Sequence, residues 1–126
     1  MTAAPSTLGL WGWGREMQAL HTVLLAHGTP PQTIIAPAVE HAAMRTTLGA
    51  ATPTLQDTAA PDLSGLHTLY KTPGQTLYSP IIQKFLAQGG TVTSGTNLWF
   101  AQPRPGASVV GVTGTKGKST TCALLA

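Results

Sequence analysis

Short apolar runs alternate with helical patterns along most of this chain. The runs that have the length of buried strands lie at residues 7–11, 33–36, 66–70 and 91–93. A further short strand is expected near Thr54–Gln56, inside a stretch rich in Thr, Pro and Ala at residues 50–64. Strands that alternate with helices form parallel sheets with right-handed crossovers. The pattern therefore predicts an α/β fold, with ligands at the carboxyl ends of the strands.

The segments between these runs carry helix patterns and helix end signals. One face of the first predicted helix holds Met17, Leu20, Val23 and Leu24. Gly28 can end this helix, and residues 41–48 predict a shorter one stopped by a glycine. Ser79 followed by Pro80 predicts a third helix, with a hydroxyl cap and a proline in its first turn. Gly89 and Gly90 are expected to end it.

Composition narrows the classes of function. The 126 residues suffice for one domain with a core, and 42% of them are hydrophobic. The net charge of +3 comes from few groups, and no basic run is interleaved with aromatic residues. Binding to nucleic acid is therefore not expected. The one cysteine, Cys122, excludes an internal disulfide and a zinc cluster built from cysteines.

The N-terminus and the hydropathy of the chain leave the cytoplasm as the expected location. No segment reaches 18 consecutive apolar residues, so no membrane span is expected. Residues 1–6 lack the basic start and the long apolar stretch of a signal peptide. The four histidines are scattered, and His21 and His27, near one helix, are expected to solvate or cap it and not to bind a metal. Trp11, Trp13 and Trp99 are expected to pack, although Trp13 lies in a glycine turn where a ligand could contact it.

A glycine-rich loop near the end of the chain is the strongest chemical signal. It reads Gly-Val-Thr-Gly-Thr-Lys-Gly-Lys-Ser-Thr over residues 111–120. An apolar run at residues 108–113 predicts a strand before it, and residues 120–126 read as the start of a helix. Strand, glycine loop and helix are the context of a phosphate-binding loop. The common G-x-x-x-x-G-K-[ST] form has glycine where Val112 stands, and the alternative is a polar turn with two chance lysines.

The match to a phosphate-binding loop predicts a role for each residue of this segment. Loop N–H groups cradle phosphates, a lysine reaches the β- and γ-phosphates, and a hydroxyl reaches Mg²⁺. The expected ATP-binding residues are Gly114, Thr115, Lys116, Gly117, Lys118, Ser119 and Thr120. Lys118 is the candidate catalytic residue, and Ser119 and Thr120 are the candidate Mg²⁺ ligands. Six residues follow Thr120, so we expect an N-terminal piece of a larger ATP-using enzyme.

Two turns that follow predicted strands form a second candidate site. Gly12-Trp13-Gly14-Arg15 partly matches G-x-G-x-x-G, with Met17 at the third glycine position. Such a turn lets a phosphate approach the N-terminus of the next helix. The turn Thr72-Pro73-Gly74 is the second candidate phosphate contact. The plain alternative for both is a turn that needs glycine or proline only for its geometry. No acidic residue stands where an NAD ribose would be held, which argues against a dinucleotide.

These motifs together resemble the Mur ligase family. The resemblance is carried by Leu8–Gly14, Thr72–Gly74, the helix start at Ser79-Pro80 and the loop at Val112–Thr120. The family's loop also lacks the first glycine of the common form. Order and spacing fit over nearly the whole chain, although residues 38–65 match poorly.

The resemblance implies a domain organisation. Residues 1–102 would form a Rossmann-like domain that binds the UDP part of a substrate. Residues 103–107 would be a linker, with a helical turn before it at residues 97–102. Residues 108–126 would begin a central ATP-binding domain, as strand, P-loop and helix. Gly12, Trp13, Gly14, Arg15, Thr72, Pro73 and Gly74 would face the UDP diphosphate.

The resemblance also implies a reaction. ATP with Mg²⁺ would activate a carboxylate as an acyl phosphate, and an amine would displace the phosphate. The best match is the member that adds D-glutamate to UDP-N-acetylmuramoyl-L-alanine in peptidoglycan precursor synthesis, as a monomer. Another ligase of the Mur or folylpolyglutamate type is the alternative, as is a non-catalytic nucleotide-sugar binding module. We expect no ligation or ATP hydrolysis by residues 1–126 alone.

Three positions depart from the family pattern. Lys116 stands where asparagine is usual, which adds a charge beside the phosphates. Ala36 stands where close relatives carry an acidic residue for the uridine, which puts uracil recognition in doubt. Met17 replaces a small residue and is expected to crowd the first helix.

Overall fold

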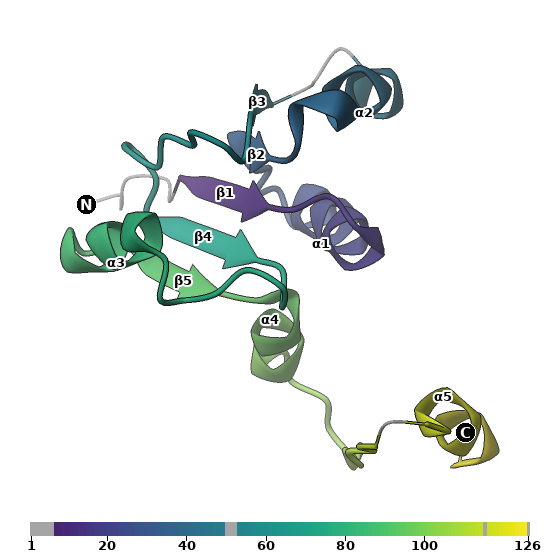
Figure 1. Cartoon of the computed structure of the whole chain (residues 1–126). Coiled ribbons are helices and arrows are strands. Elements are labelled where there is room, and N and C mark those ends of the chain that lie inside the picture. Colours follow the sequence, from purple (N-terminus) through teal and green to yellow (C-terminus); the bar gives the residue numbers. More distant parts are fainter. Residues whose placement is uncertain (1–6, 50–52, 115, 126) are drawn as a thin grey trace.

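The computed structural model describes residues 7–49, 53–114 and 116–125, and it shows a three-layer α/β arrangement (Figure 1). The strands are β1 (Leu8–Trp11), β2 (Thr33–Ile35), β3 (Thr54–Gln56), β4 (Thr68–Lys71) and β5 (Thr91–Thr93). The helices are α1 (Arg15–Ala26), α2 (His41–Leu48), α3 (Pro80–Ala87), α4 (Gly95–Ala101) and α5 (Lys118–Leu125), with a 3₁₀ turn η1 (Ala38–Glu40) before α2. These bounds confirm the strands and helices that the apolar pattern predicted before residue 103.

The sheet has five parallel strands in the order β3-β2-β1-β4-β5. The chain builds outward from β1 to β3 and then returns to place β4 on the other side of β1. Leu10 pairs with Ile34 on one side and with Tyr70 on the other. The order of strands therefore reverses between β1 and β4, and the loops that follow these two strands meet there. In open parallel sheets, such a reversal point is where ligands bind.

Two apolar clusters cover the two faces of the sheet. Alternate residues along each strand face opposite sides, so Leu10 and Ile34 lie in one cluster while Trp11 and Ile35 lie in the other. The first cluster joins the sheet to α1 and α2, and the second joins it to α3. Figure 1 shows α3 on one side of the strands and α1 with α2 on the other.

The helix ends follow the expected rules in most places. The N–H of Gly28 bonds to the carbonyl of Leu25, and that of Thr29 bonds to the carbonyl of Leu24, a Schellman motif that ends α1. Gly28 has a positive φ of 73°, as this motif needs. The hydroxyl cap expected from Ser79 is not formed. Its Oγ instead accepts a bond from Gln75 Nε2 at 3.4 Å.

Met17 is fully buried in the first cluster and packs as a core residue, and its crowding of α1 stays a prediction. One expectation for α1 is corrected. Val23 was assigned to the buried face, but it is 43% exposed. The reason is geometric, because Leu20 and Leu24 already fill the sheet side of that turn. The side chain of Val23 instead lines a groove toward α4.

The predicted strand at residues 108–113 is not formed. Residues 107–114 have no regular structure, and Val110 is 71% exposed. A strand needs a partner for its backbone groups, and this segment pairs with none of the five strands. The helix of the motif does form, as α5, but none of its described residues is buried. Figure 1 shows α5 well apart from the sheet.

Two kinds of feature are absent from residues 7–49, 53–114 and 116–125. No helix there is long and apolar enough to cross a bilayer. No group of three or more His, Cys, Asp or Glu side chains there could hold a metal ion.

Candidate functional site

The reversal point brings the two predicted phosphate turns together. The N–H of Thr72 donates to the carbonyl of Trp11 at 3.1 Å, which continues the pairing of β4 with β1. The N–H of Gly12 donates to the carbonyl of Ile35 at 2.7 Å, which ties the same turn to β2. Gly12–Arg15 and Thr72–Gly74 therefore lie side by side at the carboxyl edge of the sheet.

Gly12 has a packing reason to be glycine. Its φ is +113°, which side chains rarely adopt. A Cβ at this position would overlap the Thr72 side-chain methyl. The close approach of the two turns therefore depends on the missing side chain. By contrast, a Cβ on Gly14 would meet nothing within 4 Å, so there is open space beside it.

The N-terminus of α1 presents backbone donors at this edge. Gly14 is the N-cap residue, and no side chain caps the helix. The first N–H groups of a helix lack intrahelical partners and carry partial positive charge. Arg15 is exposed at the first position of this helix. Backbone and side chain together can therefore hold an anionic group.

The Trp13 ring is fixed by packing. It lies against the first apolar cluster and meets the His21 ring edge-on, with 5.4 Å between ring centroids. Gln18 Nε2 donates to the Trp13 carbonyl at 2.9 Å. Partial burial lowers the pKa of His21 below its usual value of 6.5. These contacts hold the turn that carries the glycines, and His21 supports the Trp13 ring.

Lys71 is a further candidate for this site, and the sequence motifs did not single it out. It ends β4 directly before Thr72, and its Nζ lies 3.5 Å from the Thr72 carbonyl oxygen. The N–H of Gln75 closes the turn by donating to the same carbonyl at 3.1 Å. A lysine at the end of a predicted strand, directly before a Thr-Pro-Gly turn, was the available signal. Lys71 adds a positive charge to the edge that already holds Arg15.

His41, the first residue of α2, makes contacts near this edge that the sequence did not predict. Ala36 is fully buried, and its N–H donates to the Gln56 carbonyl at 3.0 Å. His41 Nε2 lies 2.8 Å from the Ala36 carbonyl oxygen and 3.2 Å from that of Gln56. The side chain therefore joins the carboxyl ends of β2 and β3. The sequence showed a lone histidine at a helix start, and nothing in it indicated this bridge.

The second predicted site lies on an exposed segment. Gly114 and Gly117 have positive φ values of 147° and 79°, as a glycine loop requires. The N–H of Thr121 donates to the Gly117 carbonyl at 2.9 Å, which opens α5. Lys118, Ser119 and Thr120 form its first turn, and all are exposed like Lys116. Thr115 lies outside the described residues.

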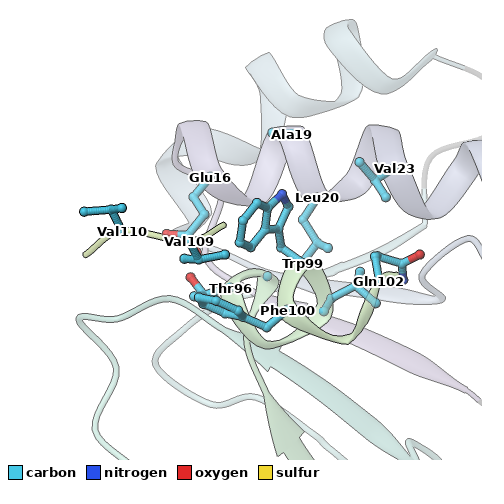
Figure 2. Close-up of a pocket in the computed structure, with 12 residues that line it drawn as sticks. Glu16, Ala19, Leu20, Val23, Thr96, Trp99, Phe100, Gln102, Val109 and Val110 are labelled. Atoms are coloured by element: carbon cyan, nitrogen blue, oxygen red, sulfur yellow. The ribbon is translucent and has the colours of Figure 1, made fainter. Parts of the chain in front are cut away.

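An apolar groove of about 600 Å³ lies between α1 and α4 (Figure 2). Leu20 and Val23 line it from α1, and Trp99 and Phe100 line it from α4. The Arg104 guanidinium lies 3.7 Å from the centroid of the Trp99 ring and donates to the main-chain carbonyls of Trp99 and Phe100. Val109 and Val110, which precede the glycine loop, also border the groove. The segment between α4 and the glycine loop therefore runs beside this groove.

The chain is similar to a set of curated ligases. It is 37% identical to a UDP-N-acetylmuramoyl-L-alanine–L-glutamate ligase of Xylella fastidiosa strain 9a5c. It is 40% identical to the protein of that name in Xanthomonas oryzae pv. oryzae and 31% identical to the one in a Micromonospora species. Each match covers 94% of this chain and 26% of the relative. No family model matches the chain.

The extent of the match agrees with the motifs. The chain spans about a quarter of the length of the curated relatives it matches, and within that quarter it contains the reversal-point turns and the glycine loop. The five-stranded parallel sheet agrees with the Rossmann-like domain that the resemblance implied. Over nearly all of its length, this chain is therefore homologous to one part of a Mur ligase.

Proposed function

We propose that this chain is the UDP-substrate-binding part and the start of the ATP-binding part of an ATP-dependent amide ligase. The reaction joins glutamate to UDP-N-acetylmuramoyl-L-alanine for peptidoglycan. The observation that carries the proposal is the meeting of Gly12–Arg15 with Thr72–Gly74 at the reversal point of the sheet. The domain boundaries are proposed as residues 1–102, 103–107 and 108–126.

The reversal point is proposed to hold the UDP diphosphate. Free N–H groups at the start of α1 suit its oxygens. Arg15 and Lys71 supply two positive charges from the two sides of the reversal point. Charge-assisted bonds to phosphate are stronger than neutral ones. The Trp13 backbone, Pro73 and Gly74 complete the turns that shape this edge.

The glycine loop is proposed to hold ATP with Mg²⁺. Its donor set fits that ligand, because it combines backbone N–H groups from Gly114 to Gly117, the Lys118 ammonium and the hydroxyls of Ser119 and Thr120. Lys116 adds a second cation, and Thr115 is part of the same proposed loop. Mg²⁺, held by Ser119 and Thr120, would neutralise phosphate charge. Lys118 would stabilise charge on the transferring phosphoryl group.

The proposed chemistry has two steps. A carboxylate oxygen of the UDP substrate takes the γ-phosphoryl group of ATP, and ADP leaves. The glutamate amine then attacks the carbonyl carbon of the acyl phosphate, an amide bond forms, and phosphate leaves as the amine loses a proton. The residues of the two proposed sites position the reactants and stabilise charge. These two effects account for most of the catalysis of phosphoryl transfer.

The amino acid is proposed to be L-glutamate. The sequence resemblance led us to expect D-glutamate, whereas the names of the relatives specify L-glutamate. Assaying the ligase encoded by the complete reading frame with each enantiomer decides between them. We further propose that this ligase is cytoplasmic and monomeric.

Calorimetric titration of the chain tests the proposed UDP site. UDP-N-acetylmuramoyl-L-alanine and UDP are expected to saturate it, whereas ATP binds weakly because the loop segment lacks support. Absence of binding by both uridine ligands contradicts the proposed UDP site. The reading frame beyond residue 126 tests the ligase: a continuing ATPase domain supports it, and a stop codon supports a nucleotide-sugar binding module.

A further inference from the structure

Arg104 joins the end of α4 to residues 103–107, the proposed linker. Its guanidinium lies 3.7 Å from the centroid of the Trp99 ring, which is close enough for a cation–π interaction. The same group donates to the main-chain carbonyl of Trp99, and to that of Phe100 at 3.3 Å. Carbonyls in the last turn of a helix lack intrahelical partners, so these bonds also cap α4. We call Arg104 with Trp99 and Phe100 the α4 clamp.

The helix that carries this clamp is anchored to the Rossmann-like unit. It follows β5 after a single residue, Ser94, whose hydroxyl oxygen accepts a bond from the N–H of Asn97 at 3.2 Å and caps the start of α4. Leu98 packs against the first apolar cluster, which contains Leu20 of α1. The α4 clamp therefore holds the linker relative to α1 and to the sheet.

The backbone of the linker is restricted as well. Its two prolines fix their own φ and disfavour a helical conformation in the residue before each. Gln102, which precedes the first proline, is accordingly extended, with a ψ of 135°. The N–H of Ala107 donates to the carbonyl of Arg104 at 3.1 Å, and Gly106 between them has a φ of +76°. Proline followed by such a glycine is typical of a type II turn, so the linker is not a flexible tether.

The linker determines where the following segment lies. Val109 and Val110 come shortly after it and border the groove between α1 and α4, and the glycine loop begins at the next residue. At its N-terminus, α1 carries Arg15 of the proposed UDP site. Figure 1 shows the chain leaving α4 away from the sheet. The two proposed sites are therefore connected through α1, α4 and the linker.

We propose that Arg104 is a positioning residue for the ligation, because it orients the segment that carries the ATP loop. This inference rests on the proposed function. The first proposed step joins the γ-phosphoryl group of one ligand to a carboxylate of the other, so two sites on different segments must meet in one geometry. A linker that is ordered before binding lowers the entropic cost of this meeting. Arg104 acts through the direction of the linker and not through contact with a substrate.

The distance between two spin labels on the 126-residue chain tests the α4 clamp. The labels are attached to Lys84→Cys on α3 and to Ser108→Cys after the linker, both exposed positions, with Cys122→Ser as the background. One narrow distance peak is expected. Arg104→Met should widen this peak about twofold, because a freed linker samples many end-to-end distances. Arg45→Met is the matched control at an exposed arginine of α2, and it should leave the width unchanged.

A second variant protects this test from side effects of the methionine. Gly106→Ala keeps Arg104 but strains the turn, because a φ of +76° disfavours a side chain even though the added Cβ would meet nothing within 4 Å. It should also widen the peak. A broad peak in the unmodified chain overturns the proposed order of the linker. Widening by Gly106→Ala but not by Arg104→Met assigns that order to the turn and overturns the role of Arg104.

Kinetics of the ligase encoded by the complete reading frame test the positioning role. Arg104→Met should lower kcat about tenfold with an unchanged KM for the UDP substrate, because a misdirected linker affects the step that joins the two ligands. Arg45→Met should change neither constant. An unchanged kcat, or a rise in KM alone, overturns the positioning role. Absence of glutamate ligation by the unmodified ligase overturns the proposed function and the role of Arg104 in it, whereas the α4 clamp is judged by the distances.

Discussion

Two glycine-containing turns of this chain, both candidate phosphate sites, have different surroundings. The turn at Gly12–Gly14 joins β1 to α1, and hydrogen bonds tie its edges to β2 and β4. The loop at residues 111–117 follows an unpaired segment and opens α5, which has no buried residue. In the first, neighbouring strands determine the backbone conformation. In the second, the described residues have no neighbouring strand, and the positive φ values of Gly114 and Gly117 reflect the local preference of glycine.

The difference shows what a phosphate loop needs besides its motif. A turn can present N–H groups to an anion at low entropic cost only where packing already holds it. The reversal-point turns meet this condition, and the glycine loop at residues 111–117 does not meet it within this chain. We therefore expect the two regions to differ in their effect on UDP affinity and on the free energy of unfolding.

Replacing Lys118 should give the largest effect, on activity. In the ligase encoded by the complete reading frame, Lys118→Met removes the cation nearest the transferring phosphoryl group. We expect kcat to fall by at least about 100-fold. UDP binding by the 126-residue chain should not change, since Lys118 is exposed. Phosphate release in steady-state assays measures the first effect, and an equal loss of UDP affinity would break the proposed separation of the sites.

The two regions should also differ in their contribution to stability. Met17→Ala removes a fully buried side chain from the first cluster, so we expect it to lower the free energy of unfolding by about 3 kcal/mol. Leu124→Ala is the matched change on α5, where the side chain is 82% exposed. Its effect should stay within about 0.5 kcal/mol. Urea titrations compare the two, and similar losses would show that α5 is packed.

Gly12→Ala should have a somewhat smaller effect, confined to the reversal point. The new Cβ would overlap Thr72, and the positive φ of 113° would be strained. We expect a loss of about 2 kcal/mol in the free energy of unfolding, with weaker UDP binding. Gly14→Ala is the control, because nothing lies within 4 Å of its added Cβ. If the two variants melt at the same temperature, the close contact between the two turns is not needed.

The smallest effect concerns pH. Burial lowers the pKa of His21, so the unfolded chain binds this proton more readily than the folded chain. Stability from this group is fully present above pH 6.5 and is lost as the pH falls below that value. His21→Gln should reduce this slope in thermal melts between pH 7.5 and 5.5. An unchanged slope would assign the pH dependence to other groups.

Local patterns predicted most elements before residue 103. Runs such as Thr33–Ile35 and the glycine at position 28 carry their signal within a few neighbours. The prediction of a strand at residues 108–113 was wrong because a strand needs a pairing partner, and the local sequence does not show whether one is present. The prediction that Val23 is buried was wrong because two neighbours on its helix already fill the space toward the sheet.

The sequence alone determined the α/β class, the two glycine motifs and the resemblance to Mur ligases. These features depend on residue types at short spacings. Only the tertiary structure brought Gly12 against Thr72, placed Lys71 beside the same edge and fixed His41 on the carbonyls of Ala36 and Gln56. The physical reason is that strand order is set by long-range pairing. The groups that meet at the sheet edge are distant along the chain.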